Sequence, residues 1–202
     1  PPRHVATSRH RRRMKAWTKR RHQLLSMRTA ESNRREHSRD TVIARSIARI
    51  IKALDCELAA VEKQLRELID RHPDLRQKQD VLTSIPGISE TTATMLLTEV
   101  PELGQINRRQ MASLIGVAPI NRDSGTFRGK RMTGGGRYLV RTRLFMPTLV
   151  ACRFNPHLKN FYERLLKNGK TKMTAIIATM RKLLAIMNTM IAKNQTWMAN
   201  LT

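Results

Sequence analysis

A serine lies between an aspartate and a glycine near the middle of the chain, followed by a run of cations. A serine hydroxyl among guanidinium groups could attack a phosphodiester, because arginines bind phosphate oxygens in pairs and offset the negative charge that develops during attack. The serine is Ser124, and the neighbouring cations are Arg122, Arg128, Lys130, Arg131, Arg137 and Arg141. These residue types would suit a catalytic site in the protein that binds the phosphates of a nucleic acid.

The alternative for Ser124 is an ordinary turn without chemistry. Asp123, Ser124 and Gly125 are residue types that form turns for backbone reasons. A hydrolase-type serine would also need a base and an orienting group. All six histidines lie outside this stretch, and the nearest in sequence is His157. Spacing alone therefore favours the turn and argues against a catalytic triad.

Several blocks around Ser124 resemble the C-terminal domain of a bacterial insertion-sequence transposase family. In chain order they are residues 114–119, 122–126, 128–131, 135–137 and Arg141. The family is of the DEDD type, related to the Piv and MooV DNA invertases and known as bridge-RNA-guided recombinases. The resemblance also takes in residues 20–25, 31–34 and 180–184, so it extends over nearly the whole chain.

This resemblance implies a mechanism and a set of partners. Family members join an N-terminal RuvC-like domain, with four metal-binding carboxylates, to a C-terminal domain with a nucleophilic serine, which falls on Ser124. The implied partners are DNA, a structured guide RNA and further copies of the chain. The chain starts where the RuvC-like domain would end, so we expect a fragment or a truncated copy. We expect no cofactor or metal within it, with Mg²⁺ held by the RuvC-like domain.

The charge of the chain fits a nucleic-acid partner. There are 39 Lys and Arg against 15 Asp and Glu, which gives a formal net charge of +24. Such a chain gains affinity for a polyanion by releasing counterions. A ribosomal or chromatin-like protein would have a similar composition. A membrane-surface protein fits less well, because aromatic residues are only 4% of the chain.

Other sequence features point to the cytoplasm. No apolar run reaches about 18 residues, so we expect no membrane span, and the start lacks a signal-peptide core. Cys56 and Cys152 are far apart and without metal-ligand spacing, so we expect two buried free thiols. No motif for a small-molecule substrate is present.

The first predicted domain, residues 1–75, is a helical hairpin or coiled coil. A basic helix within residues 1–38 precedes a long amphipathic helix that begins at Thr41, with Asp40 or Thr41 as N-cap. The basic face could bind phosphate or be merely solvated. The four-residue steps within the long helix's apolar seam predict a stutter. The seam consists of Ile43, Ile47, Ile50, Leu54, Leu58, Val61, Leu65 and Leu68.

The second predicted domain, residues 76–202, is a compact helical domain that carries the glycine- and arginine-rich loop. Two short helices meet at Pro86 and Gly87, with Ser89 as N-cap of the second, as in a helix-hairpin-helix that offers backbone N–H groups to phosphate. A buried helical corner explains Gly87 equally well. Further helices are expected at residues 108–114, 138–153, 155–167 and 174–193, and no segment alternates as a strand does. The fold class is mainly α.

The leading functional prediction is the C-terminal part of a serine-using DNA transposase or recombinase. In this interpretation Ser124 attacks DNA, the arginines hold the phosphate and Asp123 shapes the turn. The alternative is a noncatalytic nucleic-acid-binding remnant of a truncated transposase, whose binding would not depend on Ser124.

Overall fold

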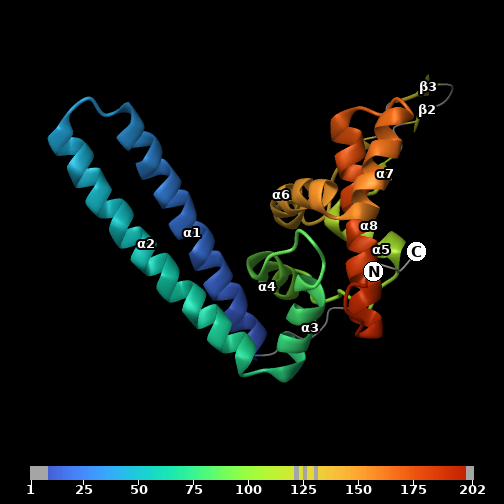
Figure 1. Ribbon diagram of the computed structural model, residues 1–202, viewed down its shortest axis with the longest axis horizontal. Helices are drawn as coiled ribbons and strands as arrows, with labels where there is room; N and C mark the ends of the chain where they lie inside the picture. Colours follow the sequence, from blue (N-terminus) through green and yellow to red (C-terminus); the bar gives the residue numbers. More distant parts are fainter. Residues whose placement is uncertain (1–8, 121–122, 125–126, 130–131, 199–202) are drawn as a thin grey trace. The chain divides into compact units, whose positions relative to one another are not determined.

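The prediction of a mainly α fold is confirmed by a computed structural model, which describes residues 9–120, 123–124, 127–129 and 132–198. These residues form eight helices and four strands of two residues each. The chain divides into two compact units, Pro1–Arg76 and Gln77–Thr202, coloured blue to teal and green to red in Figure 1.

The first unit is a hairpin of α1 (Arg9–His37) and α2 (Thr41–Asp70), which lie side by side (Figure 1). Asp40 is the N-cap of α2, as predicted. Its carboxylate accepts hydrogen bonds from the backbone N–H groups of Val42, at 2.6 Å, and Ile43, at 3.3 Å. The cap satisfies two donors that have no partner within the helix.

The seam of α2 differs from the predicted one at two positions. Ile43 and Ile50 are 54% and 46% exposed, whereas Ile51 is only 8% exposed. Ile69, next to Leu68, is also buried. The other buried residues of α2 follow alternating steps of four and three, so the predicted stutter is wrong. They are Ile47, Ile51, Leu54, Leu58, Val61, Leu65 and Leu68.

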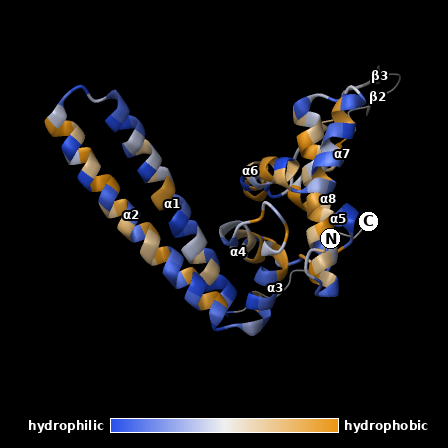
Figure 2. Ribbon diagram, viewed as in Figure 1, coloured by the Kyte–Doolittle hydropathy of each residue, from blue (hydrophilic) through white to orange (hydrophobic). Residues whose placement is uncertain are grey.

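The partner helix α1 contributes few apolar side chains to this seam. Figure 2 shows α1 as largely hydrophilic and α2 as carrying more hydrophobic residues. Met14 and Leu24 are fully buried, while Arg21 and Arg28 pair with Glu62 and Asp55 of α2, at 2.7 and 2.5 Å. Such half-exposed ion pairs add little stability, so we attribute the hairpin's stability mainly to the apolar contacts of α2.

The second unit is built around α8 (Lys172–Lys193). It packs against α5 (Arg108–Ile115), α6 (Tyr138–Phe154) and α7 (Pro156–Lys167), while α4 (Glu90–Glu99) packs on α6. Helix α3 (Pro73–Thr83) connects the two units. On α6, Val140, Leu144 and Ala151 face the core. Leu139 and Val150 are exposed.

By length and composition alone, α8 could cross a membrane. The core helices of soluble proteins pass the same test, and 56% of its apolar window is buried inside the protein. Met180, Leu183 and Met187 on α8 are completely covered. The apolar character of α8 is therefore explained by its position in the core and is weak evidence for a span.

The adjacent pair Ile50 and Ile51 tests the position of the seam. We expect Ile51→Ala to lower the unfolding free energy of the hairpin by about 2–4 kcal/mol, because it leaves a cavity. The exposed control Ile50→Ala should change it by less than about 0.5 kcal/mol. Urea unfolding followed by Trp17 fluorescence, in a Trp197→Phe background, measures both. Equal losses for the two variants would contradict this seam.

The two cysteines should differ in reactivity. Cys56 is exposed, contrary to the expectation of two buried thiols, because it lies off the seam of α2, while Cys152 is buried. Burial raises the pKa of the Cys152 thiol, opposed in part by a hydrogen bond with Thr179. At about pH 8 iodoacetamide should therefore modify Cys56 in the folded protein, and Cys152 only after denaturation. Peptide mass spectrometry measures this, and equal modification of both in the native state would count against the packing of α6.

Candidate functional site

The Ser124 stretch forms two small antiparallel ladders between α5 and α6. β1 (Pro119–Ile120) pairs with β4 (Met132–Thr133), and β2 (Asp123–Ser124) pairs with β3 (Phe127–Arg128). We call residues 119–133 the Ser124 hairpin. The sequence predicts a loop without strands here, because strands of two residues are too short to show an alternating pattern.

The backbone of Ser124 lies in β2 opposite Phe127, and that of Asp123 lies opposite Arg128. Ser124 and Arg128 thus belong to the same ladder, as their closeness in sequence suggests. Arg122, Lys130 and Arg131 lie outside the residues that the structure describes. Their predicted roles as phosphate ligands, and that of Ser124 as nucleophile, stay predictions.

The two ends of the Ser124 hairpin meet backbone to backbone. Gly116, the C-cap of α5, and Gly136 both have positive φ, 76° and 61°. A Cβ atom on Gly136 would lie 2.5 Å from the N atom of Gly116 and 2.7 Å from the carbonyl oxygen of Leu114. The Arg137 N–H donates to that same carbonyl at 2.8 Å. We call this junction the hairpin base; only glycine fits at its closest approach.

Arg137 binds an acidic residue of its own chain. Its Nη1 donates to the carbonyl oxygen of Glu99 and to Oε2 of Glu102, both at 2.7 Å, and its Nη2 donates to Oε1 of Glu102 at 2.6 Å. Glu102 is only 9% exposed. The paired, nearly buried geometry makes this a strong charge-assisted interaction. It ties the start of α6 to the segment that follows α4.

Arg141 binds three backbone carbonyls at the hairpin base. Its Nη1 donates to the oxygens of Ile115, Gly116 and Gly135, at 3.3, 3.0 and 2.8 Å. Two of these carbonyls lie at the C-terminal end of α5, where helix carbonyls lack partners and a cation is favourable. Both Arg137 and Arg141, which the sequence analysis predicted as phosphate ligands, thus already have protein partners.

Gly87 lies in a packed turn between α3 and α4. Its φ is +99°, and a Cβ atom there would lie 2.9 Å from the backbone N of Ala151 on α6. Ile85 and Ile88 on either side are buried, and Ser89 caps α4 through the N–H of Thr92, at 3.3 Å. This packing explains the glycine as a helical corner. A contact of Gly87 with nucleic acid stays a prediction.

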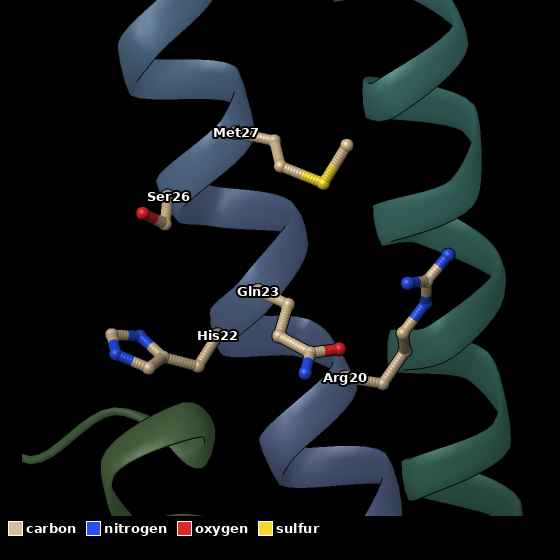
Figure 3. A pocket seen from close by; sticks show the side chains of 5 residues that line it. All are labelled: Arg20, His22, Gln23, Ser26 and Met27. Carbon is tan, nitrogen blue, oxygen red and sulfur yellow. The ribbon is translucent and has the colours of Figure 1, made fainter.

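No metal site is evident in the described part of the chain, where no three His, Cys, Asp or Glu side chains gather as ligands. A pocket on α1 in the first unit is lined by Arg20, His22, Gln23, Ser26 and Met27. Figure 3 shows His22 and Ser26 pointing to one side of the helix, and Arg20 and Met27 pointing to the other. Because these side chains point away from one another, they do not form a common binding or catalytic site.

Adjacent glycines at the hairpin base provide a matched test of its packing. Gly135 and Gly136 both have positive φ, but a Cβ atom on Gly135 would meet nothing within 4 Å. Gly135→Ala should cost only the backbone strain, about 1 kcal/mol of unfolding free energy. Gly136→Ala should cost at least about 2 kcal/mol more, because its methyl group meets backbone atoms. Urea unfolding followed by Trp197 fluorescence, in a Trp17→Phe background, compares them; a smaller loss for Gly136→Ala would refute the packing.

Comparison with known proteins connects this geometry to a family. Residues 79–163 match the sequence family described as "Transposase IS116/IS110/IS902 family". The chain is 33% identical over 143 residues to a pilin gene-inverting protein of Moraxella bovis, an alignment covering 68% of this chain and 44% of that protein.

Two further relatives come from insertion elements. An uncharacterized 43.6 kDa protein of insertion element IS110 from Streptomyces coelicolor is 27% identical over 152 residues, which is 74% of this chain and 36% of that protein. An uncharacterized 42 kDa protein of insertion element IS900 from Mycobacterium paratuberculosis is 28% identical over 153 residues, with coverages of 73% and 36%. The chain spans less than half the length of these relatives. Residues 79–163, which contain the Ser124 hairpin and its base, therefore carry a domain of the transposase IS116/IS110/IS902 family.

Proposed function

We propose that this chain acts in DNA transposition or inversion, and that Ser124 is the nucleophile that cleaves the DNA strand. The observation that carries the proposal is the family match over residues 79–163, which has the Ser124 hairpin near its centre. A relative named for gene inversion and two from insertion elements support a recombination reaction on DNA.

In the proposed reaction the Ser124 oxygen attacks a DNA phosphorus and loses its proton to a base. A P–O bond forms to serine while the P–O bond to one sugar breaks, and the departing sugar oxygen takes up a proton. The phosphoserine conserves the bond energy, so a sugar hydroxyl of another strand can attack it, restore a phosphodiester and release the serine. Strand exchange then needs neither hydrolysis nor an external energy source.

Cations near Ser124 would bind the DNA backbone in this proposal. Arg122, Arg128, Lys130 and Arg131 are close to it in sequence, and they would offset charge on the phosphate as the new bond forms. The net charge of +24 favours DNA through counterion release.

The remaining partners follow from the family resemblance and are part of the proposal. A structured guide RNA would select the DNA by base pairing. Mg²⁺ would be held by carboxylates of a RuvC-like domain outside the present residues. Several copies of the chain would assemble on the two DNA sites that exchange strands. Cytoplasmic DNA would be the substrate.

A second candidate function is noncatalytic binding of nucleic acid. The net charge of +24 favours binding of a polyanion whether or not Ser124 reacts. Such a remnant would bind DNA or RNA through its cations and would form no covalent bond with either.

A covalent adduct distinguishes the two candidates. Labelled DNA with the element's own ends, nicked beside the cleavage site to trap the intermediate, is incubated with Mg²⁺, the element's RNA and the chain, with and without a separately supplied RuvC-like domain. A denaturing gel then reports protein bound to DNA. We expect an adduct with the unaltered chain and none with Ser124→Ala.

The matched control is Ser113→Ala, because Ser113 is an exposed serine on α5 in the same unit. It should form the adduct as the unaltered chain does. An adduct that persists in Ser124→Ala would overturn the assignment of the nucleophile. Tight DNA binding without an adduct under any condition would overturn catalysis and support the noncatalytic remnant.

A further inference from the structure

We propose that Arg137, Glu102 and Arg141 are positioning residues that fix the hairpin base, and that the two arginines are not phosphate ligands. Their role in the reaction rests on the proposed function of Ser124, whereas their role in holding the hairpin does not. The assignment replaces the prediction that Arg137 and Arg141 grip DNA, and it adds Glu102, which the sequence analysis did not single out.

Three of the five N–H groups of the Arg137 guanidinium bind groups of the protein itself. Both N–H groups of Nη1 are used, one for the Glu99 carbonyl and one for Glu102, and an N–H of Nη2 binds the second oxygen of Glu102. If a phosphate drew the Arg137 guanidinium away, the nearly buried Glu102 carboxylate would be left without its counter-ion. The phosphate would also bring a second negative charge close to that carboxylate. Breaking a buried ion pair in this way is strongly unfavourable.

Arg141 binds the backbone through its Nη1. One guanidinium nitrogen serves carbonyls from both ends of the hairpin, those of Ile115 and Gly116 before it and that of Gly135 after it. The contact is tight, because a Cβ atom on Gly116 would lie 2.3 Å from Nη1 of Arg141 and 2.2 Å from the oxygen of Gly135. Removing Arg141 would leave carbonyls at the end of α5 without this donor.

The two arginines therefore both bind at the hairpin base, through different partners. Arg137 ties the segment after the hairpin to Glu102 and Glu99, and Arg141 ties the segments before and after the hairpin together. A nucleophile must be held to about 0.5 Å and 10–20° to react efficiently, and an error of about 1 Å costs roughly a hundredfold in rate. The described strands β1 and β4 lead from this base to the ladder that contains Ser124, so a movement of the base is transmitted to Ser124.

Two readouts separate a positioning residue from a phosphate ligand. The first is the salt slope, the slope of log affinity for duplex DNA against log salt concentration. This slope is negative, and its magnitude decreases by about 0.9 for each lost phosphate contact. The second is hydrogen exchange of backbone amides in peptides covering residues 117–120 and 132–137, which reports local opening of the hairpin base. Neither requires the chain to be catalytic.

We expect Arg137→Gln, Glu102→Gln and Arg141→Gln to speed exchange in these peptides by about tenfold, with an unchanged salt slope. Arg128→Gln, at a predicted phosphate contact, is the comparison variant and should lower the magnitude of the slope without changing exchange at the base. Glu102→Gln is the most discriminating variant. If Arg137 were a DNA ligand, removing its acidic partner would tighten binding and leave exchange unchanged, and that result would overturn the proposal.

If the glutamine variants unfold, lysine variants of the two arginines can still test the positioning role. Arg141→Lys retains an ammonium with three N–H groups for the three carbonyls, so it should restore slow exchange, and Arg137→Lys should restore it in part. With DNA saturating, adduct formation should slow in the glutamine variants and recover in the lysine variants. Slow exchange in all glutamine variants, or a slope lowered in magnitude by about 0.9 in Arg137→Gln, would refute the positioning role. Loss of the Ser124 assignment would leave the exchange results standing.

Discussion

The ion pair between Arg137 and Glu102 is the interaction on which the geometry of the candidate site depends. It joins the start of α6 to the segment after α4, with the Glu99 carbonyl as a third partner. The backbone bond from Arg137 to Leu114 brings the end of α5 to the same place. Three helices therefore converge where the Ser124 hairpin leaves the domain. A charge pair suits this position because the nearly buried Glu102 carboxylate receives two hydrogen bonds from the guanidinium of Arg137.

The helices around this junction form a rigid frame because they share the core of the second unit. α8 supplies the central apolar surface, and its buried methionines and leucines pack against α5, α6 and α7. Glycine is required where backbones touch, at Gly116 and Gly136 in the hairpin base and at Gly87 against α6. The described strands of the Ser124 hairpin form two short ladders, which join this frame at the hairpin base.

The first unit is held together in a different way. Helix α1 is too polar to form an apolar interface of its own, so α2 provides most of the seam, and arginines of α1 pair with acidic residues of α2. The rest of the α1 surface stays strongly basic. The proposed function uses this division: the second unit positions the chemistry, and the positive charge spread over both units draws the chain to a polyanion. In this proposal the charge provides affinity for DNA, while the family match over residues 79–163 points to recombination.

Sequence alone determined the features that depend on neighbours along the chain. The mainly α class, the α2 boundary at Asp40, the Ser89 cap and the family resemblance around Ser124 all follow from local patterns of caps, turns and apolar spacing. Tertiary structure decided what depends on distant partners. Whether Ile50 or Ile51 enters the seam depends on where α1 packs, and the partner of Arg137 is 35 residues away in sequence. A cation in a glycine-rich stretch looks the same in sequence whether it faces DNA or a buried carboxylate, because only folding brings Glu102 to it.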